Sequence, residues 1–159
     1  GGLLFCFFGV EMFLRTESSL KESEGANWRR GANVGQLASA WVIGVSMVMI
    51  TRHPFDISLM KHLFFAMNIF YGSFIWGAFL TLSRSRLDLG LTCRGKWKLN
   101  TVRWFLVAAG FISFQLMTVM VVSENLTMAA LFEWTLTFAA EGQALTILPT
   151  LALAGSEEE

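Results

Sequence analysis

Long runs of apolar residues, separated by short polar segments, dominate the 159-residue chain. Four runs reach the length of about 18 residues or more that is typical of membrane-crossing helices, and they cover residues 32–51, 59–83, 102–122 and 128–154. A fifth run, residues 1–14, would measure only roughly 21 Å as a helix, less than the ~30 Å hydrocarbon core of a bilayer. We expect it to be the remainder of a truncated helix, because the chain starts with Gly and not with Met.

The residue types in these runs favour helices over the strands of a membrane barrel. Phe, Leu, Met, Ala and Gly predominate, without the alternation of apolar and polar positions that barrel strands carry. Hydrophobic residues make up 54% of the chain and charged residues 15%, against roughly 45–50% and about 25% in soluble domains. We therefore predict an all-α fold, a polytopic transmembrane helix bundle that forms a single membrane domain over residues 1–159.

The distribution of basic residues predicts how the bundle is oriented. Ten of the twelve Lys and Arg residues lie in two polar segments, residues 15–30 and 84–103, which would share one side of the membrane. The positive-inside rule assigns that side to the cytoplasm, together with the C-terminus. Asn125 begins an Asn-Leu-Thr triplet in a short loop on the opposite side, where it matches the acceptor pattern for N-glycosylation.

Several classes of function lack support in the composition. The twelve basic and twelve acidic residues cancel, which removes a whole-chain electrostatic argument for binding nucleic acid. Two Cys and two His provide neither a disulfide framework nor a metal-binding pattern, and no nucleophile elbow or phosphate loop is present. We therefore expect a protein that is not an enzyme, with no cofactor and no metal. Its expected partners are membrane lipids and other membrane or cytoplasmic regulatory proteins.

The last apolar run contains two carboxylates. Their presence has to be explained, because a charge at the centre of a bilayer costs on the order of 2.5–3.5 kcal/mol. Glu133 and Glu141 are eight residues apart, so they differ by roughly 80° on a helix and can share a face. One interpretation makes them a proton or cation site of a small transporter or channel. The favoured interpretation is structural, with Glu133 hydrogen-bonded to His62 or Asn68 on another helix. The polar side chains that would serve as partners in such contacts are His62, Asn33, Gln36, Asn68 and Gln115.

Basic and aromatic residues cluster where the second polar segment enters the membrane. We expect six of them to contact lipid headgroups or the interface, and Arg103 in particular to meet a lipid phosphate or water. These residues are Arg94, Lys96, Trp97, Lys98, Arg103 and Trp104. Small residues four apart, such as Gly31 with Gly35 and Ala40 with Gly44, predict close helix crossings inside the bundle.

Three features in the expected order resemble the family of damage-regulated autophagy modulators (DRAM) and their Frag and Sfk relatives. His62 begins one apolar run, Arg103 begins the next, and Glu133-Trp134 lies early in the last. The resemblance implies that the chain corresponds to helices two to six of a six-helix protein. Glu141 and the very short loop at 123–127 depart from the family pattern and leave the subfamily open.

The same resemblance implies a non-enzymatic integral membrane regulator or adaptor. Family members act in autophagy at the lysosome, in phosphoinositide-kinase regulation at the plasma membrane, or in GPI-anchor maturation in the Golgi. We therefore expect an endomembrane or plasma-membrane location with a cytoplasmic C-terminus. The alternatives are a small transporter or channel that uses the intramembrane carboxylates, and a lipid-handling accessory in GPI-anchor maturation.

Overall fold

The structure, a computed structural model, describes residues 1–21, 27–54, 56–93 and 97–148. Within these ranges the fold is all-α, as predicted, and a two-stranded hairpin is the only strand pairing. In chain order the elements are α1 (Gly2–Lys21), α2 (Asn27–Arg52), α3 (Leu59–Ser83), β1 (Thr92–Cys93), β2 (Trp97–Lys98), α4 (Leu99–Val122) and α5 (Leu126–Leu145).

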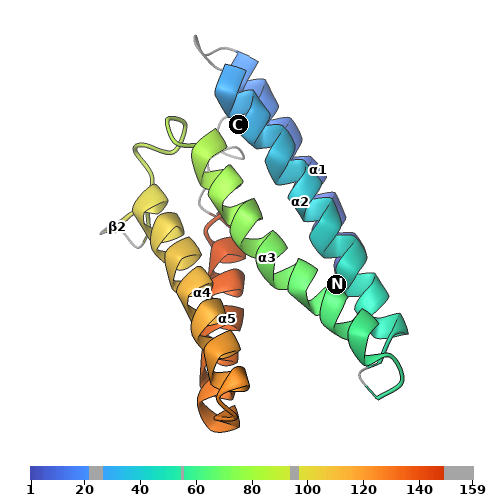
Figure 1. Ribbon diagram of the computed structural model, residues 1–159. Helices are drawn as coiled ribbons and strands as arrows, with labels where there is room; N and C mark the ends of the chain where they lie inside the picture. Colours follow the sequence, from blue (N-terminus) through green and yellow to red (C-terminus); the bar gives the residue numbers. More distant parts are fainter. Residues whose placement is uncertain (22–26, 55, 94–96, 149–159) are drawn as a thin grey trace. The chain divides into compact units, whose positions relative to one another are not determined.

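The chain divides into two compact units, Gly1–Arg84 and Ser85–Glu159. In the first unit α2 packs against both α1 and α3, and the chain reverses direction from each helix to the next (Figure 1). In the second unit the β1–β2 hairpin precedes α4, and α4 and α5 pack as an antiparallel pair (Figure 1).

Three helices of the described residues, α2, α3 and α4, are long and apolar enough to cross a membrane. The sequence predicts four such segments, at 32–51, 59–83, 102–122 and 128–154, and a shorter apolar run at residues 1–14. The first helix runs to Lys21, beyond the expected end at residue 14, and carries Glu11 and Arg15 among its apolar residues. The last helix carries Glu133 and Glu141 and ends at Leu145, and the expected end of its apolar run at residue 154 falls outside the described ranges. Charged and polar residues thus lower the hydropathy of α1 and α5.

Small residues bring α1 and α2 very close together. A Cβ atom added to Gly9 would lie 2.5 Å from the Cβ atom of Ala40, and one added to Gly44 would overlap the sulfur of Cys6 and the carbonyl oxygen of Gly2. Contacts of this kind let two backbones approach where apolar side chains alone could not bring them together. The close crossing predicted from the Ala40–Gly44 pair is confirmed.

At the contact between α2 and α3, each of two glycines leaves room for a large side chain from the other helix. A Cβ atom on Gly72 would lie 2.7 Å from Cγ1 of Ile43, and one on Gly35 would lie 2.7 Å from the ring of Phe79. At Gly31 an added Cβ atom meets nothing within 4 Å. Of the predicted Gly31–Gly35 pair, only Gly35 therefore makes a close contact.

Two short connections shape the second unit. In the hairpin, Thr92 pairs with Lys98 and Cys93 with Trp97, and the Leu99 N–H donates to the Leu91 carbonyl oxygen at 3.0 Å. The sequence predicts only a polar segment here, since strands of two residues are too short to carry a periodic pattern.

The turn from α4 to α5 contains one residue in the left-handed region, Glu124 with φ 60°. It is followed by the N-cap residue Asn125, whose Oδ1 accepts a hydrogen bond from the Met128 N–H at 3.2 Å. Such a cap satisfies one of the free N–H groups at the start of a helix. The reversal between the two helices is therefore tightly specified.

Candidate functional site

A buried ion pair lies within the second unit. The side chains of Arg103 and Asp88 are both 0% exposed, and Nη1 of Arg103 is 2.5 Å from Oδ2 of Asp88. The same nitrogen lies 3.4 Å from Oδ1 of Asn100, on the preceding turn of α4. Nε donates to the hydroxyl of Thr146 at 3.1 Å, and Nη2 donates to the carbonyl oxygen of Thr146 at 3.0 Å. Every nitrogen of the guanidinium group is thus engaged within the chain.

The hydrogen bonds continue from this ion pair into α5 and into the segment before the hairpin. The amide nitrogen of Gln143 donates to the carbonyl oxygen of Arg103 at 2.6 Å, and the Thr146 hydroxyl donates to the Gln143 carbonyl oxygen at 2.7 Å. The Asn100 amide donates to the Ser85 carbonyl oxygen at 3.1 Å. We refer to these side chains as the Arg103 cluster, which comprises Asp88, Asn100, Arg103, Gln143 and Thr146.

The position of Arg103 corrects an expectation. We expected its guanidinium group to meet lipid phosphate or water, but its partners are Asp88, Asn100 and Thr146 of the same chain. A buried arginine needs a counter-ion, and a protein carboxylate fills that role here. The sequence contains one signal that could have indicated this pairing, because Asp88 is the sole acidic residue in the basic segment 84–103.

A second buried polar group lies in the first unit, on one face of α2. Arg29, Asn33 and Gln36 are four and three residues apart, the spacing of one helix face, and they are 2%, 0% and 0% exposed. The Asn33 amide nitrogen donates to the Phe13 carbonyl oxygen on α1 at 3.0 Å. We call these three residues the polar stripe of α2.

Much of the hydrogen-bonding capacity of the polar stripe is unused. Nε of Arg29, Oδ1 of Asn33 and both amide atoms of Gln36 are buried without a hydrogen-bond partner in the part of the chain that the structure describes. Buried polar atoms in native proteins are rarely unpaired, so three such side chains in a row call for an explanation. From the sequence we expect Asn33 and Gln36 only as partners for a carboxylate, and Arg29 only as one of the basic residues of segment 15–30.

Side chains of α1 and α3 also reach one another within the first unit. The rings of Phe5 and Trp76 lie 5.4 Å apart between centroids, and Nη1 of Arg84 donates to the Thr16 hydroxyl at 3.1 Å. Both Trp76 and Thr16 are buried. The three helices therefore form a unit with its own polar interior.

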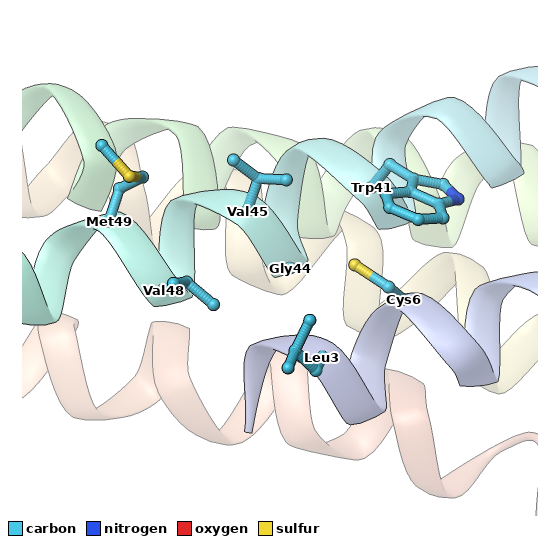
Figure 2. A pocket seen from close by; sticks show the side chains of 7 residues that line it. All are labelled: Leu3, Cys6, Trp41, Gly44, Val45, Val48 and Met49. Atoms are coloured by element: carbon cyan, nitrogen blue, oxygen red, sulfur yellow. The ribbon is translucent and has the colours of Figure 1, made fainter.

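Apolar hollows lie on the surfaces of both units. In the second, a hollow of about 420 Å³ is lined by Trp97 of the hairpin and by Thr101, Val102 and Phe105 of α4. Its volume falls within the ~300–1,000 Å³ range of small-molecule sites. In the first, a smaller hollow of about 160 Å³ lies between α1 and α2, where the sulfur of Cys6 points toward α2 near Gly44 (Figure 2).

The other residues expected at the membrane interface are exposed where they are described. Trp97 is 65% and Trp104 44% exposed, and Lys98 is exposed as well. Arg94 and Lys96 lie outside the described residues. Contact of these side chains with lipid headgroups stays a prediction.

The expected intramembrane polar residues do not gather into one site. Glu133, Glu141 and Gln115 are exposed in the second unit. In the first unit Asn68 is half-buried and lines a hollow of about 350 Å³ between α2 and α3, and Nδ1 of His62 lies 3.0 Å from the His53 carbonyl oxygen. Because Glu133 belongs to one unit and His62 and Asn68 to the other, the expected contact between them stays a prediction.

Asn125 is exposed, and its side-chain oxygen caps α5. Its exposure is compatible with glycosylation, which stays a prediction.

No family model, no curated protein and no solved structure matches this chain. The resemblance to the DRAM, Frag and Sfk family therefore stays a prediction. At the coarser level, three helices long and apolar enough to span a bilayer, in an all-α fold, are the features of an integral, multi-pass membrane protein.

Proposed function

We propose that this chain is a multi-pass membrane protein that acts as a non-enzymatic regulator or adaptor, in the manner that its resemblance to autophagy modulators implies. The location that goes with this role is the lysosome, the Golgi or the plasma membrane, with the C-terminus in the cytoplasm. The observation that carries the proposal is the Arg103 cluster. Its buried charges are neutralised within the chain and join α4 to α5, which suits a scaffold that holds its helices in a fixed arrangement.

The carboxylates support the same role. A proton or cation carrier needs titratable groups that converge on a water-filled path. Glu133 and Glu141 are exposed on α5, and the buried carboxylate Asp88 is occupied by Arg103. The arrangement favours a structural use of these charges over transport.

The apolar hollow beside Trp97 offers the regulator a surface for partners. It lies next to the basic segment 84–103, which the positive-inside rule assigns to the cytoplasm. Aromatic side chains such as Trp97 and Phe105 are enriched at protein interfaces, where they bury a large apolar area. A cytoplasmic or membrane partner would contact this face.

Rescue of cells that lack the protein tests the role. Loss of the protein should change autophagic flux, and both the wild type and the double variant Glu133→Gln, Glu141→Gln should restore it, because a regulator does not need titrating carboxylates. Normal localisation of the double variant with no rescue, together with proton flux through wild-type proteoliposomes that the variant lacks, would establish the transporter instead. Unchanged autophagic flux with loss of GPI-anchored proteins from the cell surface would favour the GPI-anchor role.

Topology is tested separately by labelling single cysteines. In a background with Cys6 and Cys93 replaced by Ser, a cysteine at Ser85 should resist an impermeant thiol reagent in intact cells and react after permeabilisation. A cysteine at Glu124 should show the opposite accessibility, exposed to the outside or to the organelle lumen. Labelling of the Ser85 position in intact cells that carry the protein at their surface would contradict the proposed orientation.

A further inference from the structure

The hollow of about 350 Å³ between α2 and α3 combines apolar walls with two polar side chains. Its volume falls within the ~300–1,000 Å³ range of small-molecule sites. Three side chains of its α2 wall are about half exposed, so the hollow opens on the surface of the unit. Both helices are long and apolar enough to cross a membrane, and that surface therefore faces lipid. The lining residues are Trp41, Val42, Val45 and Ser46 of α2 and Phe65 and Asn68 of α3.

The two polar side chains of this lining, Ser46 and Asn68, lie at the same level of the helix pair. The helices α2 and α3 run in opposite directions, and Ile43 of α2 packs against Gly72 of α3 (Figure 1). Three residues further along α2 is Ser46, and three residues back along α3 from Gly72 is the residue that follows Asn68. Both polar groups are therefore placed at one depth in the membrane.

Neither Ser46 nor Asn68 has a hydrogen-bond partner within the described residues of the first unit. By contrast, the hydroxyls of Ser39 on α2 and Ser73 on α3 each donate to a carbonyl oxygen of their own helix at 2.7 Å. Hydrocarbon offers no hydrogen bonds, so an unpaired amide or hydroxyl within the bilayer is unfavourable. A ligand that reaches both groups would remove this cost.

The depth of the two groups excludes a charged headgroup. Ser46 lies six residues before the end of α2 and Asn68 nine residues after the start of α3, roughly 9 and 13 Å along the helix axes. Helices of 26 and 25 residues exceed the ~30 Å hydrocarbon core by roughly 4 Å at each end, so both groups lie below its surface. The described lining contains no charged side chain, and a phosphate or carboxylate at this depth would lack a counter-ion. The polar group of the ligand is therefore uncharged.

The chemistry of the lining matches a single hydroxyl group on a rigid apolar body. A hydroxyl donates one hydrogen bond and accepts two, so it can donate to Oδ1 of Asn68 and accept from the Ser46 hydroxyl. Trp41 and Phe65 supply aromatic surface, and the ring of Phe65 is stacked on that of His53 at 5.7 Å between centroids, which fixes its orientation. A rigid ring system loses little conformational freedom on such a surface, whereas a lipid with two flexible chains has to order both.

We propose that the hollow between α2 and α3 binds a sterol. The sterol hydroxyl bonds with Ser46 and Asn68, and the rings lie against Trp41 and Phe65. The inference uses the membrane placement of α2 and α3 but not the regulator role, so either can fail without affecting the other.

The test measures sterol binding to the full chain, purified in an uncharged detergent. The probe is cholesterol that carries a photoreactive group on its ring system, and the readout is the labelled fraction of the protein in competition with unlabelled lipids. Cholesterol should displace the probe, and the labelled peptides should contain residues 41–46 or 65–68. Epicholesterol, which differs only in the orientation of its hydroxyl, and dioleoylglycerol should each displace the probe about tenfold less effectively, as expected for loss of a hydrogen bond.

Filling the hollow should prevent labelling without removing either polar group. Val42→Phe puts a larger side chain into the space and should reduce labelling by about tenfold or more. The matched control is Val34→Phe, eight residues back along α2 at an exposed position outside this lining, which should label like the wild type. An equal loss of labelling in both variants, or in neither, would mean that the probe does not occupy the hollow.

The polar groups are tested by Ser46→Ala and Asn68→Leu. Each should weaken displacement by cholesterol by roughly 3–10-fold and reduce the preference for cholesterol over epicholesterol. Ser73→Ala is the control, because the Ser73 hydroxyl is already bonded to the Ile69 carbonyl oxygen, and it should not change binding.

Three results would overturn the proposal. Equal displacement by epicholesterol would show that the hydroxyl is not recognised, and equal displacement by dioleoylglycerol would identify a general groove for neutral lipids. A dimer of two copies that Asn68→Leu dissociates would show that Asn68 pairs with a second copy of the chain. The first two results come from the wild type, so they decide the question even if Asn68→Leu does not fold.

Discussion

Among the described residues, each unit contains one arginine that is at least 98% buried, and the two arginines differ in their partners. Arg103 is surrounded by a carboxylate, an amide and two oxygens of Thr146, all from its own unit. Arg29 is buried to nearly the same degree without a carboxylate partner in the described residues. Burial alone therefore does not define the role of a charged residue. The two arginines differ in whether the hydrogen bonds of the guanidinium group are satisfied within the described part of the chain.

The interactions that hold the helices together also differ between the two units. The first unit relies on close backbone approach at Gly9, Ala40 and Gly44, and its polar stripe adds one hydrogen bond between described residues, from Asn33 to the Phe13 carbonyl oxygen. The second unit relies on the Arg103 cluster to connect the start of α4 with the end of α5. A substitution that disrupts the packing of one unit should thus leave the other unit largely intact.

The largest effect should come from removing the charge of Asp88. Asp88→Asn leaves the Arg103 guanidinium buried without its counter-ion, which should lower the free energy of unfolding by about 3–5 kcal/mol. Chemical denaturation of the detergent-purified protein measures the change. Arg86→Gln, at an exposed position in the same segment, is the control and should have little effect. Equal stability of Asp88→Asn and the control would mean that the cluster does not hold α4 and α5 together.

The next largest effect should come from filling the α1–α2 crossing. Gly44→Val would force its side chain against Cys6 and the Gly2 carbonyl oxygen, and overpacking of this kind costs about 1–3 kcal/mol. The same denaturation measurement applies. Gly31→Ala is the control, because an added Cβ atom there meets nothing within 4 Å and alanine favours a helix over glycine by roughly 0.5–1 kcal/mol. A Gly44→Val protein as stable as the wild type would show that the two helices can separate freely.

Replacing a buried glutamine by leucine should change the free energy of unfolding in opposite directions in the two units. Gln143→Leu removes the 2.6 Å bond to the Arg103 carbonyl oxygen and should cost about 1 kcal/mol, whereas Gln36→Leu removes an unpaired buried amide and should stabilise the lipid-free protein by about 1 kcal/mol. Both changes are read from unfolding in lipid-free detergent. If Gln36→Leu destabilises as much as Gln143→Leu does, the stripe is already satisfied within the protein, and the contrast between the units disappears.

The smallest effect should come from Glu133→Gln. The side chain is exposed and the substitution preserves its shape, so the free energy of unfolding should change by less than about 0.5 kcal/mol. Glu133→Leu extends the test, because loss of a hydrogen bond to another helix would cost roughly 1–2 kcal/mol. A cost in that range for the leucine variant alone would indicate that Glu133 makes the helix contact expected from the sequence.

The sequence predicted the features that depend on local pattern. The apolar runs at 32–51, 59–83 and 102–122 correspond to α2, α3 and α4, and the Ala40–Gly44 spacing predicted a close crossing. Hydropathy and helical spacing are properties of neighbouring residues, which is why a single sequence reveals them.

The partners of buried polar residues could not be predicted in the same way. The bonds of Arg103 reach 15 residues back to Asp88 and 43 residues ahead to Thr146. Neither separation follows a helical or strand period, so only the fold brings these atoms together. Arg29 was overlooked for a related reason, since it belongs to a basic segment that the positive-inside rule had already explained.

The separations within the Arg103 cluster also imply an order of assembly as the chain emerges from the ribosome. Asp88 and Asn100 precede Arg103 in the sequence, so the guanidinium group can be neutralised as soon as the first turn of α4 has formed. Gln143 and Thr146 are made some 40 residues later and can join only after α5 is complete. Synthesis runs from the N-terminus, and domains fold as their residues become available. The local contacts thus protect the charge during insertion, and the late contacts from α5 complete the cluster at the end of synthesis.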